Sequence, residues 1–448
     1  MFENKTQEQA KNEIFSIITE YYQKYMREED KPFAEGRDAV HYAGRVFDEQ
    51  ELIYGVDSVL EFWLTAGRFT RELEDALKEY LGIKYAALVN SGSSANLIAF
   101  QALTSPLLEE SRRIRKGDEV ITVAAAFPTT ITPIVQFGAV PVFLDIEIPS
   151  YNIDVTRLED ALSDRTKAVF IAHTLGNPFN LKEVKAFCEK HHLWLIEDNC
   201  DALGSEYTID GVTKKTGTWG DIGTSSFYPA HHMTMGEGGA VYTDNPILYR
   251  ALLSLRDWGR DCHCLGGHDN MCGHRYEGDY GELPHGYDHK YVYSHLGYNL
   301  KVTDIQAAIA CAQIKKLPGF VKRRQENFKY LYEQLSVLED KLYLPKADPN
   351  ASVSWFGFPI TVRNAENRDK LVQALEQNKI QTRMLFSGNM IKHPCFDEMR
   401  EAKTGYRVVG DLTNSDRTLF ETFWIGVYPG MAKEMLDFMV KVMVETLR

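Results

Sequence analysis

The stretch YAALVNSGSSAN, residues 85–96, joins a short apolar run to a polar turn that opens a helical pattern. The apolar run 85–89 has the length of a buried strand, and the polar residues after it are typical of a turn. Free backbone N–H groups at a helix start, together with the hydroxyls of Ser93 and Ser94, form a good phosphate site. Serine-rich turns also cap many helices that bind no ligand, so this motif alone leaves both interpretations open.

The same alternation continues along the chain. Helical patterns, such as those of residues 71–80 and 93–103, separate further apolar runs of strand length. These runs cover residues 119–123, 140–144, 168–172, 193–196 and 239–242. Strands that alternate with helices predict an α/β fold with a mainly parallel sheet that is covered on both faces.

The pattern predicts three parts. Residues 1–55 form an N-terminal helical segment, because apolar residues recur at helical spacing between positions 10 and 30. Residues 56–314 form the large domain with the sheet. Residues 315–448 form a smaller C-terminal α+β domain, which begins with a charged helical stretch and contains a predicted strand at 353–362 and helix at 368–377.

The composition, 44% hydrophobic and 25% charged over 448 residues, is ordinary for a soluble globular protein with a large core. A net charge of −13 without a basic stripe argues against nucleic-acid binding. No apolar run approaches membrane-spanning length, and the first residues lack the layout of a secretory signal, so we expect a cytoplasmic protein that does not bind membranes. Its seven cysteines are then better explained as thiols or ligands than as disulfides.

Four of these cysteines suggest a metal site. Cys262, Cys264 and Cys272 form a C-x-C-x7-C cluster, and Cys200 stands upstream, just after a predicted strand. Four thiolates are what an iron–sulfur cluster requires; they also suit zinc, and a histidine of the loop could replace one of them. The loop 262–286 is rich in glycine and has little core, so a bound cluster would supply its missing constraint.

Two other side chains follow predicted strands. Asp198 lies at the carboxyl end of a buried strand, where α/β sheets bind ligands, although an acidic residue there also caps strand-to-loop turns. Phe127 follows the strand at 119–123, and its ring could stack on a flat ligand, although a core phenylalanine is the commoner outcome.

The segment SFYPAHHMTMGEGG, residues 226–239, resembles the lysine loop of the sugar aminotransferases that depend on pyridoxal phosphate (PLP). In that family a serine stands five residues before the lysine that holds PLP as a Schiff base. Five residues after Ser226 this chain has His231, whose imidazole cannot form a Schiff base. The resemblance therefore implies free pyridoxamine phosphate (PMP) as the cofactor and His231 as an acid/base, although paired histidines alone are usually plain polar loop residues.

From about residue 56 onward the chain resembles the DegT/DnrJ/EryC1 sugar aminotransferase family, and specifically its PMP- and 2Fe-2S-dependent CDP-4-keto-6-deoxyglucose 3-dehydratase branch. Besides the histidine loop and the cysteines, the segments that carry the resemblance are GSSAN at 92–96, ITVAA at 121–125, AHTLGN at 172–177, EDNCDALG at 197–204, DWGRDC at 257–262 and HLGYN at 295–299. The resemblance implies the fold of the fold-type I PLP-dependent transferases.

The resemblance also implies roles for individual residues. The implied cofactor contacts are Ser93, Ser94 and Ser226 at the phosphate, Asp198 at the pyridine nitrogen, Phe127 on the ring face, Asp201 near the ring hydroxyl, and Asn299 at the phosphate of the neighbouring subunit. The contact from Asn299 implies a homodimer. His231 would be the catalytic base, and the four cysteines named above would bind a 2Fe-2S cluster.

The implied reaction removes the C3 hydroxyl of a nucleotide-linked 4-keto-6-deoxyhexose, by resemblance CDP-4-keto-6-deoxy-D-glucose, on the route to the 3,6-dideoxyhexoses of lipopolysaccharide. An NADH-dependent iron–sulfur flavoprotein reductase is the partner that the resemblance implies. The chain shows no Gly-x-Gly-x-x-Gly dinucleotide fingerprint, so it has no evident route to take hydride from NADH by itself. Three alternatives stay open: a PLP aminotransferase, which needs a lysine at position 231; a cluster-free PMP dehydratase, which has no use for the cysteines; and a non-enzymatic redox protein on the same scaffold.

Overall fold

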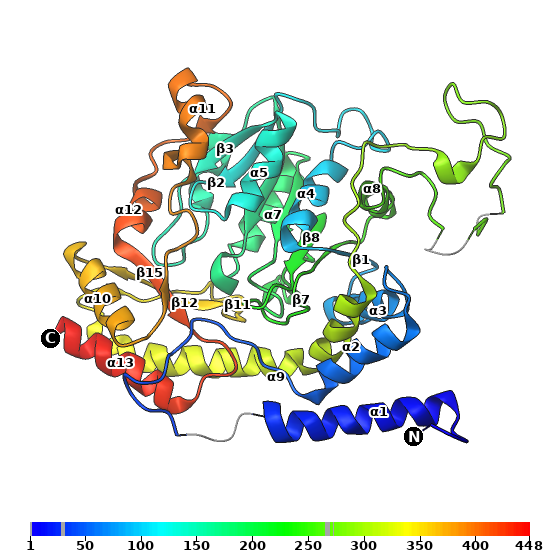
Figure 1. The fold of residues 1–448 in the computed structure, drawn as a ribbon. Coiled ribbons are helices and arrows are strands. Elements are labelled where there is room, and N and C mark those ends of the chain that lie inside the picture. Colours follow the sequence, from blue (N-terminus) through cyan, green and yellow to red (C-terminus); the bar gives the residue numbers. More distant parts are fainter. Residues whose placement is uncertain (1, 28–31, 265–268, 272) are drawn as a thin grey trace.

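The computed structural model describes residues 2–27, 32–264, 269–271 and 273–448, and at its centre is an eight-stranded sheet (Figure 1). The strand order is β1-β9-β8-β5-β4-β2-β3-β14. The strands from β8 to β14 are parallel, whereas β9 is antiparallel to both of its neighbours. The bounds are β1 Tyr85–Val89, β2 Glu119–Val123, β3 Val140–Leu144, β4 Thr166–Ala172, β5 Trp194–Asp198, β8 Ile222–Ser226, β9 Gly239–Thr243 and β14 Arg407–Val408. The predicted, mainly parallel sheet is confirmed.

Helices cover both faces of this sheet, as the sequence predicts. One face packs against α4 (Gly92–Ala102), α5 (Pro128–Phe137) and α8 (Pro246–Arg256). The other packs against α3 (Arg68–Leu81), α7 (Leu181–Lys190) and α9 (Asp304–Leu335). Successive side chains of a strand point to opposite faces, so Phe170 of β4 contacts the first layer and Val169 the second. Each fully buried apolar side chain of this kind contributes about 1.5–3 kcal/mol to stability.

Two strands of the sheet, β8 and the two-residue β14, were not predicted from the sequence. The predicted strands lie at β1, β2, β3, β4, β5 and β9, with the ends of the last three shifted by one or two residues. Strand β8 has the sequence IGTSS, which lacks the apolar run that marks a buried strand, yet all five residues are buried. Its neighbours β5 and β9 supply the backbone partners, so pairing rather than composition makes this segment a strand.

The C-terminal part contains a four-stranded antiparallel sheet of order β10-β12-β15-β13. Its strands are β10 Leu342–Tyr343, β12 Gly357–Val362, β13 Thr382–Arg383 and β15 Thr422–Gly426, and the helices of this part are α10 Glu366–Gln377, α11 Asp397–Ala402, α12 Thr413–Glu421 and α13 Lys433–Leu447. Strand β12 is shorter than the predicted strand, because residues 353–356 form an extended approach to it. Helix α9 runs without a break past residue 314, and β14 returns to the large sheet, so the two predicted domains are joined along α9 (Figure 1).

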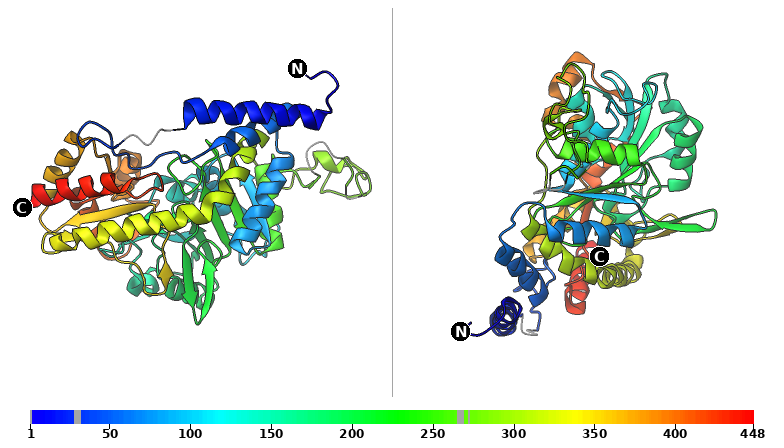
Figure 2. Two further views of the ribbon diagram at one scale, coloured as in Figure 1. Left: turned by 90° about the horizontal axis from the view of Figure 1, so that it is seen from below. Right: turned by 90° about the vertical axis from the view of Figure 1, so that its right-hand side faces the viewer.

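The N-terminal segment contains the helix predicted between positions 10 and 30, whereas residues 32–48 are not helical and the next helix, Glu49–Glu61, extends past the predicted boundary at residue 55. Helix α1 (Gln7–Tyr21) begins with a capping box between Thr6 and Gln9, continues into a π-helical turn and lies along the outside of α2 (Glu49–Glu61) (Figure 2). The remaining short elements are α6 Leu158–Ala161, β6 Glu206–Ile209, β7 Val212–Lys215 and β11 Ala351–Ser352. Among the described residues, no helix combines the length and apolar character needed to cross a membrane.

The described residues of the cysteine loop, 262–286, leave the body of the molecule beyond α8 (Figure 1). Side chains such as Met271 and Tyr276 are exposed there, in agreement with the expected lack of a core. Ion pairs hold the loop instead, including two contacts of 2.8 and 2.7 Å from Arg275 to Asp288.

Candidate active site

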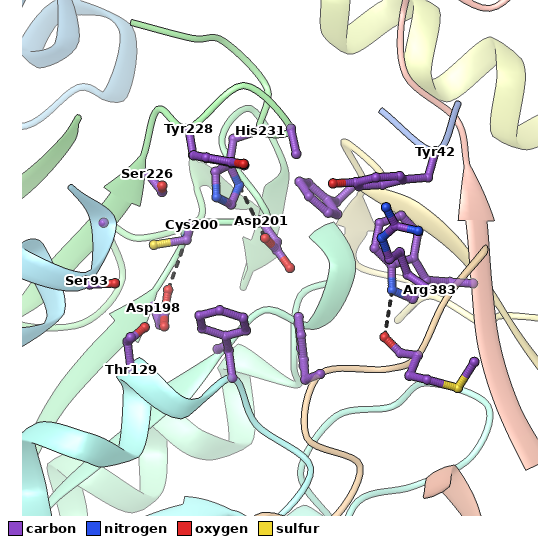
Figure 3. A pocket seen from close by; sticks show the side chains of 18 residues that line it. Tyr42, Ser93, Thr129, Asp198, Cys200, Asp201, Ser226, Tyr228, His231 and Arg383 are labelled. Atoms are coloured by element: carbon purple, nitrogen blue, oxygen red, sulfur yellow. Dashed lines mark hydrogen bonds and ion pairs between the residues drawn. The ribbon is translucent and has the colours of Figure 1, made fainter. Parts of the chain in front are cut away.

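A cavity of about 350 Å³ lies where the carboxyl ends of the central strands face the smaller sheet (Figure 3). Asp198 and Ser226 enter it from the ends of β5 and β8, and His231 enters from the loop after β8. Arg383 and Trp424 enter from the smaller sheet. Chain segments far apart in sequence therefore meet at this edge, where parallel sheets place their ligands.

Asp198 is held rigidly at the end of β5 and is only 4% exposed. Its Oδ2 accepts hydrogen bonds of 2.7 Å from Asn96 Nδ2 and 2.7 Å from Thr130 Oγ1, and its Oδ1 accepts one of 3.2 Å from the backbone N–H of Cys200. The hydroxyl of Thr224 donates to Asn96 Oδ1 at 2.7 Å and fixes that amide in turn. The carboxylate is thus oriented into the cavity by donors from three elements.

The start of α4 lies on the same side of the cavity as Asp198 (Figure 3). Ser93 lines it together with Ser226, and the backbone comes so close there that a Cβ on Gly92 would lie 2.4 Å from the Cβ of Ser226. Ser94 does not line the cavity, since its hydroxyl donates to Asn90 Oδ1 at 2.6 Å within the helix cap. The helix start therefore offers free N–H groups and hydroxyls to an anion, the arrangement that phosphate groups prefer.

The two histidines of the loop point in different directions. His231 lines the cavity, with Nδ1 3.4 Å from Asp201 Oδ1. His232 is 2% exposed and donates from Nε2 to the carbonyl of Ser354 at 2.8 Å; burial lowers its pKa well below the usual value, so it is neutral at pH 7. Only the first histidine is therefore placed to act on a ligand.

Asp201 and His231 form a buried pair at the cavity with an unsatisfied hydrogen-bonding atom. Asp201 Oδ2 makes no hydrogen bond within the described part of the chain, as expected of an oxygen that faces a ligand, whereas the neighbour of His231 Nδ1 is Asp201 Oδ1 at 3.4 Å. Burial raises the pKa of Asp201, and the neighbouring imidazole of His231 opposes that shift.

Aromatic side chains cover much of the remaining wall. Phe127 lines the cavity and is 49% exposed, so the alternative of a core phenylalanine is wrong. On the far side, the guanidinium of Arg383 stacks 3.9 Å from the ring centre of Tyr42, whose ring meets Trp424 edge-on at 5.4 Å. Figure 3 shows Tyr42 and Arg383 across the cavity from Ser93 and Asp198. Arg383 is the only basic side chain other than His231 that lines the cavity among the described residues, and none of these is a lysine.

Among the described ligands predicted for the cluster, Cys200 lies apart from Cys262 and Cys264. Cys200 lines the cofactor-sized cavity, where burial and Asp198 raise the pKa of its thiol well above the usual value. Cys262 and Cys264 lie on the projecting loop and line a separate small pocket. Cys272 lies outside the described residues. Within residues 2–27, 32–264, 269–271 and 273–448, no three His, Cys, Asp or Glu side chains are grouped to hold a metal ion, because Cys200 is fixed after β5 and the others leave the body with the loop.

Asn299 also lies outside the cavity. Its backbone pairs with Asp257, and its side chain accepts a hydrogen bond of 2.7 Å from Lys301. Its predicted reach into a neighbouring subunit stays a prediction.

Several residues that line the cavity or hold Asp198 were not identified from the sequence. Asn96 belongs to the helix-start motif, and its position one turn after Gly92 is a signal that could have found it. Thr130, Tyr42 and Arg383 carry no local motif, and only the folded chain brings them to the site.

Comparison with proteins of similar sequence identifies the family of this chain. The model of the DegT/DnrJ/EryC1/StrS aminotransferase family matches residues 47–444. The lipopolysaccharide biosynthesis protein RfbH of Salmonella typhimurium is 50% identical over 437 residues, with 97% of each chain covered. The dTDP-4-dehydro-2,6-dideoxy-D-glucose 3-dehydratase of Saccharopolyspora spinosa is 47% identical over 439 residues, covering 97% of this chain and 92% of that protein.

A solved structure shares the fold. The Escherichia coli GDP-4-keto-6-deoxy-D-mannose 3-dehydratase with bound hydrated PLP superposes with a TM-score of 0.78 at 27% identity, covering 90% of this chain and 99% of that one. The predicted fold-type I PLP-dependent transferase fold is thereby confirmed, and a cofactor of the PLP/PMP type is supported. The chain belongs to the DegT/DnrJ/EryC1/StrS aminotransferase family.

Proposed function

We propose that this protein is a PMP-dependent 3-dehydratase of a nucleotide-linked 4-keto-6-deoxyhexose. The observation that carries the proposal is His231, which faces the cavity from the loop where the family's aminotransferases carry their lysine, while no lysine lines the cavity in the described chain. A PLP aminotransferase needs that primary amine. Relatives that act as 3-dehydratases on dTDP- and GDP-linked sugars support the reaction. The nucleotide CDP and the route to 3,6-dideoxyhexoses rest on the resemblance described above.

The residues at the strand ends fit such a cofactor. Ser93, Ser226 and the N–H groups at the start of α4 would bind its phosphate, and the close approach at Gly92 leaves no room there for a larger residue. Asp198 would hold the proton of the ring nitrogen, and Phe127 would cover a ring face. When bound, PMP supplies a primary amine for the sugar ketone and a pyridinium ring that takes up electrons.

His231 is the proposed acid/base. Asp201 faces its Nδ1 at 3.4 Å, which leaves Nε2 as the nitrogen that accepts a proton at the cofactor methylene. The aromatic wall of Phe356 and Trp424 limits access of water to this side of the cavity.

The far side of the cavity is the proposed substrate side. A nucleotide sugar carries a diphosphate, and the planar guanidinium of Arg383 suits phosphate oxygens. Its stacking on Tyr42 holds the guanidinium in place. The neighbouring ring of Trp424 offers an apolar face to the sugar.

The described residues do not assemble four thiolates, so no step of the reaction is derived through a 2Fe-2S cluster. The cluster with Cys200, Cys262, Cys264 and Cys272 as ligands, the NADH-dependent flavoprotein reductase, the homodimer and the cytoplasmic location stay predictions of the sequence.

The proposal is tested with protein purified anaerobically in the presence of PMP. We expect a PMP absorption band, solvent exchange at the cofactor methylene and reversible loss of the C3 hydroxyl with one member of a panel of CDP-, dTDP- and GDP-linked 4-keto sugars. Net 3-deoxy sugar should appear only when an electron-transferring flavoprotein and NADH are added. An internal-aldimine band or an amino-sugar product would identify an aminotransferase, and a 3-deoxy product from NADH alone would remove the reductase from the proposal.

A variant series assigns the base in the same assay. His231→Asn should lower exchange at the methylene by about 10²–10⁴-fold but retain PMP and sugar binding, because only the proton acceptor is removed. His231→Lys should favour a PLP aldimine, since it restores the amine. Exchange at the wild-type rate in His231→Asn would assign the base to another residue.

A further inference from the structure

Arg324 is a buried cation directly behind the proposed base. It lies in the middle of α9 and is 2% exposed. Its Nη1 donates to the carbonyls of Trp355 and Phe356, both at 3.2 Å, and its Nη2 donates to the carbonyl of His231 at 3.2 Å. Burial lowers the pKa of this guanidinium to about 10. Because a buried charge is costly, such a residue needs contacts that a neutral side chain cannot make.

His232 provides a second connection between the histidine loop and residues 354–356. Its Nε2 donates to the carbonyl of Ser354 at 2.8 Å, so the hydrogen bonds of His232 and Arg324 both run from the histidine loop or α9 to residues 354–356. A carbonyl only accepts, which fixes the proton of this imidazole on Nε2.

The segment 354–356 is itself immobilised against the large domain. The N–H of Ser354 donates to Ser205 Oγ at 2.7 Å, and the N–H of Phe356 donates to the carbonyl of Leu175 at 2.9 Å. A Cβ on Gly176 would lie 2.3 Å from the carbonyl oxygen of Ser354, so the two backbones are packed against each other. This segment is therefore a fixed support.

The His231 ring depends on that support. Its centre lies 5.2 Å from the ring centre of Phe356, and its Nδ1 has Asp201 Oδ1 as a neighbour at 3.4 Å. We propose that Arg324 and His232 are positioning residues, which clamp the histidine loop onto residues 354–356 and so hold the His231 imidazole at the reacting carbon. The inference rests on the proposed function of His231. A displacement of about 1 Å in such a group lowers a rate by about 10²-fold.

Arg324→Lys tests the clamp. Lysine keeps the positive charge but has no planar fork that can bridge three carbonyls. We expect solvent exchange at the PMP methylene to fall about 10- to 100-fold, while the dissociation constants of PMP and nucleotide sugar change by less than about threefold. In enzyme without cofactor, the ring signals of His231 in ¹⁵N-histidine NMR should shift or broaden.

Arg407→Lys is the matched control. Arg407 contacts Glu119 at 2.7 Å at the far edge of the large sheet, so its replacement should lower the melting temperature without changing exchange or the His231 signals. Equal exchange rates in Arg324→Lys and Arg407→Lys would overturn the clamp and leave Arg324 a stabilising residue only.

His232 is tested by rescue. Glutamine places an amide N–H where Nε2 donates, whereas leucine removes the donor. His232→Leu should lower solvent exchange at the PMP methylene as Arg324→Lys does, and His232→Gln should recover most of it. Because an amide cannot act as a base, such recovery would show that His232 acts by positioning. If both variants are equally impaired, His232 does not act by positioning.

Failure of the base and failure of the clamp give different results. If His231→Asn keeps solvent exchange at the PMP methylene, the proposed base is wrong and the clamp has no catalytic role. If only Arg324→Lys is unaffected, the clamp alone is wrong.

Discussion

The cofactor cavity and the cysteine loop are built in opposite ways. Asp198 in the cavity is 4% exposed and is held by donors from α4, α5 and its own turn. In the loop, the paired side chains of His274 and Glu277 are 75% and 68% exposed. Truncating a buried hydrogen-bonded group costs about 1–3 kcal/mol, whereas an exposed ion pair contributes about 0–1 kcal/mol.

This difference indicates which side chains the contacts of the fold hold in position. Packing and strand pairing hold the carboxylate of Asp198, the imidazole of His231 and the start of α4 in place around the cavity. The loop has no comparable core among its described residues, so fewer contacts within the chain fix its geometry. Perturbations of the two regions should therefore have separable effects.

The largest expected effect concerns the loop. The sequence predicts about two irons per chain in protein prepared anaerobically, the content of one 2Fe-2S cluster. Cys262→Ser or Cys264→Ser should remove the iron and leave PMP bound, as measured by metal analysis and absorption. Cys200→Ser should in addition perturb the cofactor band, because this thiol lines the cavity. Fully loaded protein with zinc and no iron would contradict the cluster.

The next effect concerns the carboxylate of the cavity. Asp198→Asn should lower the rate of methylene exchange by about 10²–10³-fold, because an amide cannot stabilise a protonated ring nitrogen by charge. Asp288→Asn is the control on the loop, where Arg275 holds the pKa of that carboxyl at about 2. It should leave exchange unchanged, and comparable losses in the two variants would show that the regions are not independent.

A smaller effect is expected at the phosphate cradle. Gly92→Ala should weaken PMP binding about tenfold or more, since the added Cβ would lie 2.4 Å from Ser226 Cβ and overpacking costs about 1–3 kcal/mol. Gly278→Ala in the loop is the matched control, because its Cβ would meet only the far end of the Tyr280 side chain. Fluorescence titration with PMP measures both, and equal affinities would contradict the assigned cradle.

The smallest effect is on the pH dependence of stability. The pKa of His232 is lowered in the folded protein, so between about pH 6.5 and the folded pKa the unfolded chain binds a proton that the folded chain does not. Its contribution to stability is therefore complete above pH 6.5 and is lost as the pH falls. Denaturant unfolding at pH 7.5 and 5.5 should show a smaller loss in His232→Gln than in the wild type; equal losses would contradict a buried neutral histidine.

Local sequence signals located much of the site. Asp198, Ser93 and Ser226 stand at strand or helix ends, and position along an α/β pattern is enough to bring such residues to one edge of the sheet. Ser94 shows the limit of this reasoning: a hydroxyl in the right motif turns into the helix cap instead. Strand β8 was missed for a related reason, since its partners and not its composition make it a strand.

The sequence by itself determined the α/β alternation, the histidine at position 231 in place of a lysine, and the family, because these depend on local periodicity and on motifs that can be read along the chain. The tertiary structure alone decided which of two adjacent histidines faces the cavity, that Cys200 lies apart from Cys262 and Cys264, and that Arg324 contacts the backbone carbonyl of His231. These outcomes depend on contacts between residues that are far apart in the sequence, such as His232 and Ser354, which are 122 positions apart. Only packing of the whole chain sets the direction of such side chains.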